Sequence, residues 1–245
     1  MSTYILVPGA WLGAWAWRET AEALRARGHE VHALTLTGLA ERAELGSTEV
    51  DLETHIGDVT GFIEDRDLHD VILVGHSYAG IVVGAVAHRI GERLSHIVYV
   101  DSAPMGDGQG MFDLLPPEAV EGLRALVAAG NGWGLPFPGQ EALAENGSVE
   151  GLTPEHWKLL GELATPHPFG TYEQRLSLPG APSGAPRKVL VACADFSGML
   201  DAGNPWLNSL IDDSWLRRDL ATGHWPMLSE PAALAEVLDR LAADR

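Results

Sequence analysis

The sequence predicts an α/β domain in which helices cover a mostly parallel sheet. Short apolar runs alternate with helical patterns toward both ends of the chain, and such alternation implies parallel strands joined by right-handed crossovers. The chain has 245 residues, of which 46% are hydrophobic, so it can build one large core. In a sheet of this kind the ligand lies beyond the carboxyl ends of the strands. We therefore expect the functional residues to follow the strands.

The first part of the chain carries the clearest alternation, beginning with a β-rich run that ends at Pro8-Gly9. The expected elements, in order, are a strand at 3–7, a helix at 17–27, a strand at 30–36, a helix at 52–65, a strand at 71–74, a helix through 87 and a strand at 96–100. The apolar stretch 71–87 could also suggest a membrane span. It contains His76, Ser77 and three glycines, however, and a spanning helix needs about twenty apolar residues. A strand, a tight turn and a helix explain this stretch better.

The pattern changes at 105–186, which is rich in proline and glycine and has short helical pieces at 117–129 and 154–163. No strand alternation is evident there. We interpret this segment as a helical cap over the carboxyl edge of the sheet, with a loosely ordered surface loop as the alternative. The α/β pattern then resumes with a strand at 188–193, a loop at 194–198, a strand at 215–220 and a helix from 231. The predicted core is therefore 1–104 and 187–245.

The sequence Gly75-His76-Ser77-Tyr78-Ala79 follows the most apolar of the predicted strands. A serine on a very tight strand-to-helix turn has its hydroxyl exposed, and small residues two positions to either side let strand and helix come close. This is the nucleophile-elbow pattern, with Ala in place of the second Gly. The pattern also occurs by chance, so the chain must supply partners for the serine.

A serine hydroxyl needs a base, and the base needs a carboxylate that fixes its tautomer. His224 lies in a Gly-His-Trp-Pro loop after the last predicted strand, and Asp195 lies at the carboxyl end of the strand before it. The chain order Ser77, Asp195, His224 is the order expected for such a triad. Asp101, at the end of another strand, and Asp201 are the alternatives for the acid.

Acyl transfer also needs donors for the developing oxyanion. We expect them to be the backbone N–H groups of Tyr78, at the start of the elbow helix, and of Ala10, just past Pro8-Gly9. Pro8 cannot donate, because it has no N–H.

Aromatic residues close to these positions are candidates for a substrate pocket, although core packing explains some of them equally well. The predicted pocket residues are Trp11, His76 and Trp225.

Composition excludes several other functions. The net charge of −18 disfavours nucleic acid and anionic membrane surfaces as partners. The histidines show no metal-binding spacing, Cys193 is the single cysteine, and no dinucleotide or phosphate-binding loop is present, so we expect no metal and no cofactor. The N-terminus lacks a basic region before its apolar residues, which favours a cytoplasmic location.

The stretch Pro8-Gly9-Ala10-Trp11-Leu12-Gly13-Ala14-Trp15-Ala16-Trp17 resembles the H-G-A-x-x-G-A-W-x-W signature of one branch of the α/β-hydrolase superfamily. That branch holds plant methylesterases, hydroxynitrile lyases and related bacterial carboxylesterases. The stretches 36–42, 75–77, 98–101 and 223–224 are also similar. The resemblance implies an α/β-hydrolase fold, cofactor-free hydrolysis of a small-molecule ester through an acyl-enzyme, a cap-lined acyl pocket and, as often in this branch, a homodimer.

The sequence also departs from the branch. The signature's first histidine is Pro8 here. The lyases resemble the esterases but have a Thr where this chain has Gly9, a Lys where it has Trp225 and an acidic residue where it has His76. Without a cation to stabilise released cyanide, lyase chemistry has no evident means. The prediction is therefore a carboxylesterase acting on small to medium, apolar or aromatic esters. The alternatives are lactone or carbon–carbon bond chemistry on a specialised metabolite, and a non-catalytic ligand-binding protein.

Overall fold

The computed structural model describes residues 1–242, and their centre is a six-stranded, entirely parallel sheet of order β2-β1-β3-β4-β7-β8. The strands are β1 (Thr3–Val7), β2 (Glu30–Ala33), β3 (Val71–His76), β4 (Leu94–Val100), β7 (Arg187–Ala192) and β8 (Leu216–Asp219). Every residue of the central strand β3 is buried. Because helices cover both faces of a parallel sheet, its inner strands are mostly apolar, which is why their runs stand out in the sequence.

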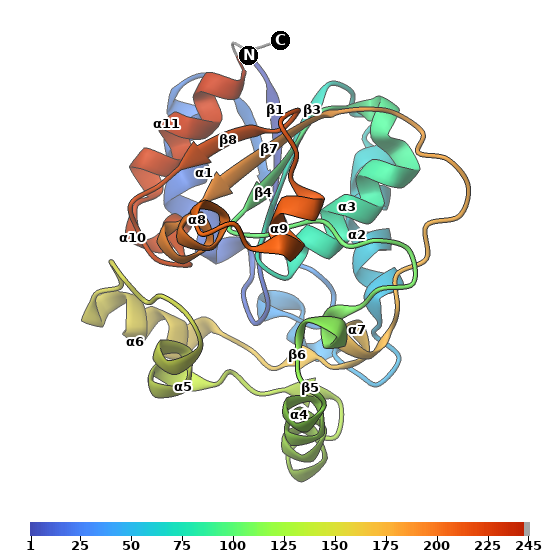
Figure 1. Ribbon diagram of the computed structural model, residues 1–245, viewed down its shortest axis with the longest axis vertical. Coiled ribbons are helices and arrows are strands. Elements are labelled where there is room, and N and C mark those ends of the chain that lie inside the picture. Colours follow the sequence, from blue (N-terminus) through green and yellow to red (C-terminus); the bar gives the residue numbers. More distant parts are fainter. Residues whose placement is uncertain (243–245) are drawn as a thin grey trace.

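Two pairs of helices cover the sheet (Figure 1). On one face lie α1 (Arg18–Ala26) and α11 (Pro231–Leu241), and on the other lie α2 (Leu52–Asp65) and α3 (Ala79–Ile90). The N-terminus of α2 is fixed by Asp51, whose carboxylate accepts a hydrogen bond from the Thr54 N–H at 2.9 Å. The α/β-hydrolase fold predicted from the sequence is confirmed.

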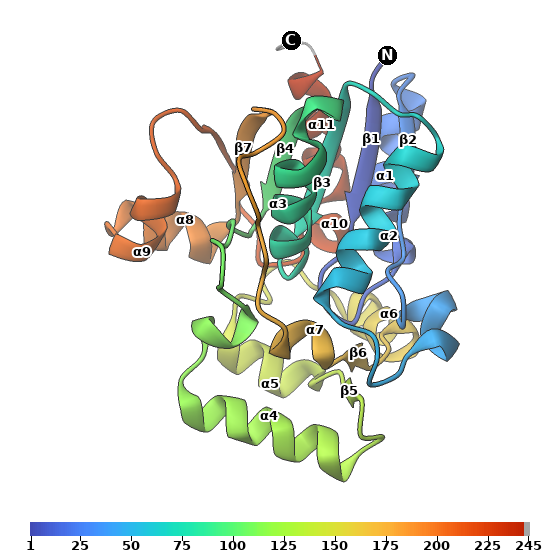
Figure 2. The same ribbon diagram turned by 90° about the vertical axis from the view of Figure 1, so that its right-hand side faces the viewer.

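The segment between β4 and β7 lies beyond the carboxyl edge of the sheet (Figure 1, Figure 2). Its elements are α4 (Pro117–Ala129), β5 (Gly134–Leu135), α5 (Gly139–Asn146), α6 (Pro154–Leu163), β6 (His167–Pro168) and α7 (Gly170–Glu173). No strand was expected here, yet β5 and β6 form a small antiparallel ribbon. With two residues in each strand, the ribbon is too short to show alternation.

A second covering element follows β7, where the sequence predicted only a loop. It consists of α8 (Ala194–Asp201) and α9 (Pro205–Leu210), and α10 (Pro226–Ser229) follows β8. Short 3-10 turns occupy Ala14–Trp17, Ala40–Leu45, Gly91–Arg93 and Met111–Leu114. Within residues 1–242, every helix is too short or too polar to span a lipid bilayer.

Candidate active site

Ser77 lies on the turn between β3 and α3 with a φ of 50°, in the left-handed region that L-residues seldom adopt. The turn is tight because the residues around it are small. A Cβ on Gly75 would lie 2.6 Å from Val83 Cγ2, and one on Gly80 would lie 2.1 Å from Ser102 Oγ. A strained residue of this kind costs about 1–3 kcal/mol, and the surrounding packing must hold it in place.

Three side chains from different parts of the chain form a hydrogen-bonded series. Ser77 Oγ lies 2.8 Å from His224 Nε2, and His224 Nδ1 lies 2.6 Å from Asp101 Oδ2. The carboxylate accepts from Nδ1–H, so Nε2 is free to accept from the serine hydroxyl. Asp101 follows β4, is 8% exposed, and its Oδ1 accepts a second hydrogen bond from the Cys193 N–H at 2.9 Å.

The structure corrects the expected acid, because His224 contacts Asp101 and not Asp195. Asp195 lies in the first turn of α8, where its side chain is exposed. Because this helix begins at Ala194, it carries Asp195 to the surface instead of leaving it on a loop that could turn back to the histidine. The other alternative, Asp201, is exposed and forms an ion pair with Arg217 at 2.8 Å.

The structure also corrects the role expected for His76, which lines neither of the two cavities at Ser77 and His224. The residue is 1% exposed, and its Nε2–H donates to the carbonyl oxygen of His224 at 2.7 Å. Burial, together with the neighbouring His224, holds the pKa of His76 well below its usual range. As the last residue of β3, it lies against the His224 ring, with the centroids 4.8 Å apart. Neutral His76 therefore supports the His224 loop.

Two cavities meet at the Ser77–His224–Asp101 series. The larger, of about 490 Å³, contains Ser77 and is walled mainly by apolar residues, among them Tyr78, Ile81, Met105, Met111, Leu114 and Trp206. The smaller, of about 320 Å³, contains His224 and the two predicted pocket residues Trp11 and Trp225. Phe196 and Asp101 belong to both cavities. No lysine or arginine lines either of them within the described residues.

The expected oxyanion donors lie beside Ser77. Tyr78 is its neighbour in the chain, and a Cβ on Gly9 would lie 3.2 Å from Ser77 Cβ, so the loop that carries Ala10 passes against the serine. Neither the Ala10 N–H nor the Tyr78 N–H donates a hydrogen bond to another residue of 1–242. Both groups are therefore free to bind an oxygen.

Sequence reasoning missed the contacts that hold this loop. Trp11 has a φ of 65°, and the segment around the β5–β6 ribbon engages all three of its polar groups. Its N–H donates to His167 Nδ1 at 3.4 Å, its carbonyl accepts from the Thr165 N–H at 3.1 Å, and its indole N–H donates to the Leu135 carbonyl at 3.0 Å. The segment between β4 and β7 thus fixes the residue that follows Ala10.

A buried network of hydrogen bonds fixes the side chain of Tyr78. Its hydroxyl donates to His55 Nδ1 at 2.9 Å, and His55 Nε2–H donates to the Thr37 carbonyl at 2.8 Å. Burial lowers the pKa of His55 to about 4, so the ring is neutral. His55 lies on the apolar face of α2, between the buried Leu52 and Val59. A histidine on the core face of a helix was the signal available in the sequence.

The Ser77–His224–Asp101 series on this fold defines a class of protein. The chain belongs to the alpha/beta hydrolase family, and the model of that family matches residues 4–237. It is 34% identical to the carbendazim hydrolyzing esterase of Nocardioides sp. (strain SG-4G) over 98% of this chain and 100% of that protein. It is 25% identical to the putative chloroplastic methylesterase 14 of Arabidopsis thaliana, over 98% of this chain and 71% of that one.

A solved structure shows the same fold. It is an extracellular alpha/beta-hydrolase from a Paenibacillus species, described as sharing structural and functional homology with tobacco salicylic acid binding protein 2. It superposes with a TM-score of 0.83 at 24% identity and covers 98% of each chain. The resemblance to the branch of methylesterases and bacterial esterases is confirmed.

Proposed function

We propose that the protein is a serine hydrolase that cleaves carboxylic esters through an acyl-enzyme. The observation that carries this proposal is the unbroken series of hydrogen bonds from Ser77 Oγ through His224 to Asp101, at 2.8 and 2.6 Å. The esterases among its relatives support the same reaction class. In this proposal Asp101, and not Asp195, completes the catalytic triad.

Acylation follows from the geometry. As Ser77 Oγ attacks the ester carbonyl, His224 Nε2 takes its proton, and the Asp101 carboxylate stabilises the imidazolium that forms. The carbonyl oxygen becomes an oxyanion held by the N–H groups of Ala10 and Tyr78, and one such donor contributes about 3 to 4 kcal/mol. His224 then gives its proton to the leaving oxygen, and the alcohol departs. Water activated by the same histidine attacks the acyl-enzyme and releases the acid.

The alcohol and acyl parts of the ester substrate occupy different cavities. The leaving oxygen must receive its proton from His224 Nε2, so the alcohol occupies the smaller cavity, which contains His224. The acyl group then occupies the larger cavity beside Ser77 and Tyr78. Its apolar wall suits a small to medium apolar or aromatic acyl group, and anionic substrates lack a cationic partner among the lining residues.

The complete series argues against a protein that only binds ligands, because binding does not require a base aligned on a serine. Lactones would use the same residues, since they are cyclic esters. The homodimer and the cytoplasmic location stay predictions.

The test is hydrolysis of p-nitrophenyl acetate, butyrate and octanoate by wild type and Ser77→Ala. Loss of a triad nucleophile lowers kcat by about 10⁶ in a comparable enzyme, so Ser77→Ala should be inactive above background. Ser95→Ala is the matched control, because Ser95 is at the start of β4 and hydrogen-bonds to the Asp70 carbonyl, outside both cavities. Equal activity of Ser77→Ala and wild type, or no activity of folded wild type on any ester, would contradict the proposal.

A further inference from the structure

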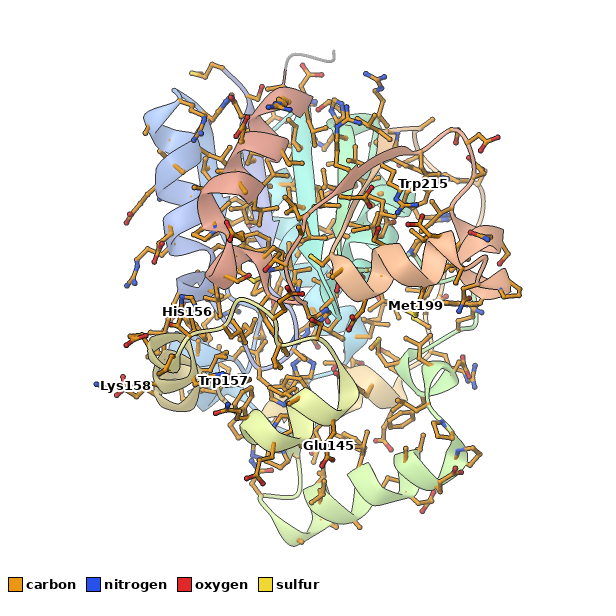
Figure 3. All side chains as sticks on the ribbon, turned by 60° about the vertical axis from the view of Figure 1, so that its left-hand side comes forward. Glu145, His156, Trp157, Lys158, Met199 and Trp215 are labelled. Carbon is orange, nitrogen blue, oxygen red and sulfur yellow. The ribbon has the colours of Figure 1, made fainter. Side chains whose placement is uncertain are left out.

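The smaller cavity combines aromatic walls with one carboxylate that the reaction does not use. Trp11, Phe196 and Trp225 line it, and the exposed side chain of Asp195 lines it as well. Leu143 of α5 and Met199 of α8 also line it, and α8 lies above α5 in both views (Figure 1, Figure 3). The cavity is thus a largely apolar space of about 320 Å³ with an acidic group in its wall.

Asp195 differs from the other carboxylates that line the two cavities. The Asp101 carboxylate accepts hydrogen bonds from His224 and from the Cys193 N–H. Asp113 of the larger cavity forms an ion pair with Arg175 at 3.0 Å. Asp195 forms no hydrogen bond or ion pair with any residue of 1–242. Its charge is therefore not compensated by a protein group, and the net charge of −18 reinforces the negative potential around it.

A carboxylate in the first turn of a helix also stabilises that helix, and this is the structural explanation for Asp195. It accounts for an acidic residue in the first turn of α8, but not for the aromatic residues that line the same cavity. Aromatic rings together with an unpaired carboxylate attract a cation, because ring quadrupole and carboxylate charge both favour positive charge. The position of the cavity then decides which part of the substrate carries the cation, since this cavity receives the alcohol and not the acyl group.

We propose that the smaller cavity binds a positively charged nitrogen on the leaving alcohol, with Asp195 as its counter-charge. The preferred substrates are then esters of amino alcohols, with a protonated or quaternary amine in the alcohol part. The inference rests on the proposed ester hydrolysis and adds no new chemical step to it.

The test uses two thioesters of nearly equal shape that differ in charge. Acetylthiocholine carries a trimethylammonium group, and S-(3,3-dimethylbutyl) thioacetate carries a neutral tert-butyl group in its place. We expect wild type to have a kcat/KM about fivefold or more higher for the charged ester, from the exposed charge pair and the cation–π contacts together. In Asp195→Asn this ratio should fall toward one, and in Asp195→Lys it should fall below one.

Asp201→Asn is the matched control, because it makes the same charge change on the same helix at a residue that lines neither cavity. It should leave the ratio unchanged, whereas a general charge effect would change it in both variants. If neither thioester is turned over, choline and 3,3-dimethylbutanol are compared as inhibitors of p-nitrophenyl acetate hydrolysis. The ratio of their inhibition constants then replaces the kcat/KM ratio in the comparison of wild type with the variants.

Two outcomes would overturn the inference. One is a wild-type ratio of one or less, and the other is an Asp195→Asn variant that changes both thioesters equally. A protein that hydrolyses p-nitrophenyl esters with either outcome refutes the cation site alone. A protein inactive on every ester refutes the proposed function itself.

Discussion

Replacing Asp101 by asparagine tests the proposed triad most directly, because the two oxygens of this carboxylate both accept hydrogen bonds. Oδ1 accepts from the Cys193 N–H at 2.9 Å and Oδ2 accepts from His224 Nδ1 at 2.6 Å. An asparagine offers one oxygen and one NH₂ group, so it cannot accept from both. The backbone N–H of Cys193 cannot reverse its role, and the amide oxygen must face it.

The NH₂ group of the introduced side chain then faces His224 and forces its Nδ1 to accept. The ring proton moves to Nε2, which can no longer accept the proton of Ser77. An equivalent change of tautomer in a serine protease lowers kcat by about 10⁴, which corresponds to about 5.5 kcal/mol of transition-state stabilisation. We expect a loss of this size in Asp101→Asn, with a much smaller change in KM.

The assay is kcat for p-nitrophenyl butyrate near neutral pH, with thermal unfolding measured to show that the variant is folded. Asp195→Asn is made in parallel and should lower kcat by less than about tenfold, because its side chain does not contact His224. The reasoning is refuted if Asp101→Asn keeps kcat within about tenfold of wild type while Asp195→Asn loses about a thousandfold.

Three further predictions concern the support of the site. His167→Asn keeps an acceptor near the Trp11 N–H, whereas His167→Gln does not. The kcat for p-nitrophenyl butyrate should therefore be about tenfold lower in the Gln variant than in the Asn variant, with a similar KM. Equal kcat values in the two variants would exclude a positioning role for His167. Gly75→Ala should lower the free energy of unfolding in urea by about 1–3 kcal/mol, because its Cβ would lie 2.6 Å from Val83, whereas Gly57→Ala, with open space around it, should not. The folded-state pKa of His55, about 4, lies below its value of 6.5 in the unfolded chain, so the unfolded state binds more protons between these values. Stability should therefore fall as pH decreases through this window, by roughly 3 kcal/mol for this residue, and His55→Gln should show a shallower fall in urea titrations between the two ends of the window.

Local sequence patterns predicted the sheet well because its inner strands are mostly buried. The run at 71–74 needs no partner to be recognised as a strand, and the small residues after it mark the turn at Ser77. The capped helix at 52–65 and the helix at 117–129 have the bounds expected from their patterns. The ribbon of β5 and β6 was missed because its pairing joins residues far apart in the chain, such as Leu135 and His167.

The proposed nucleophile and base could be identified from the sequence, since Ser77 and His224 are each marked by their own turn or loop. The acid could not. β4 and β7 are neighbours in the sheet, so Asp101 and Asp195 both follow strands that end near His224. Their backbones differ: Asp101 has a left-handed φ of 46° and is buried under the histidine, whereas a helix starting at Ala194 carries Asp195 outward. Which carboxylate reaches a distant side chain depends on how neighbouring strands end in space, and no local pattern encodes that choice.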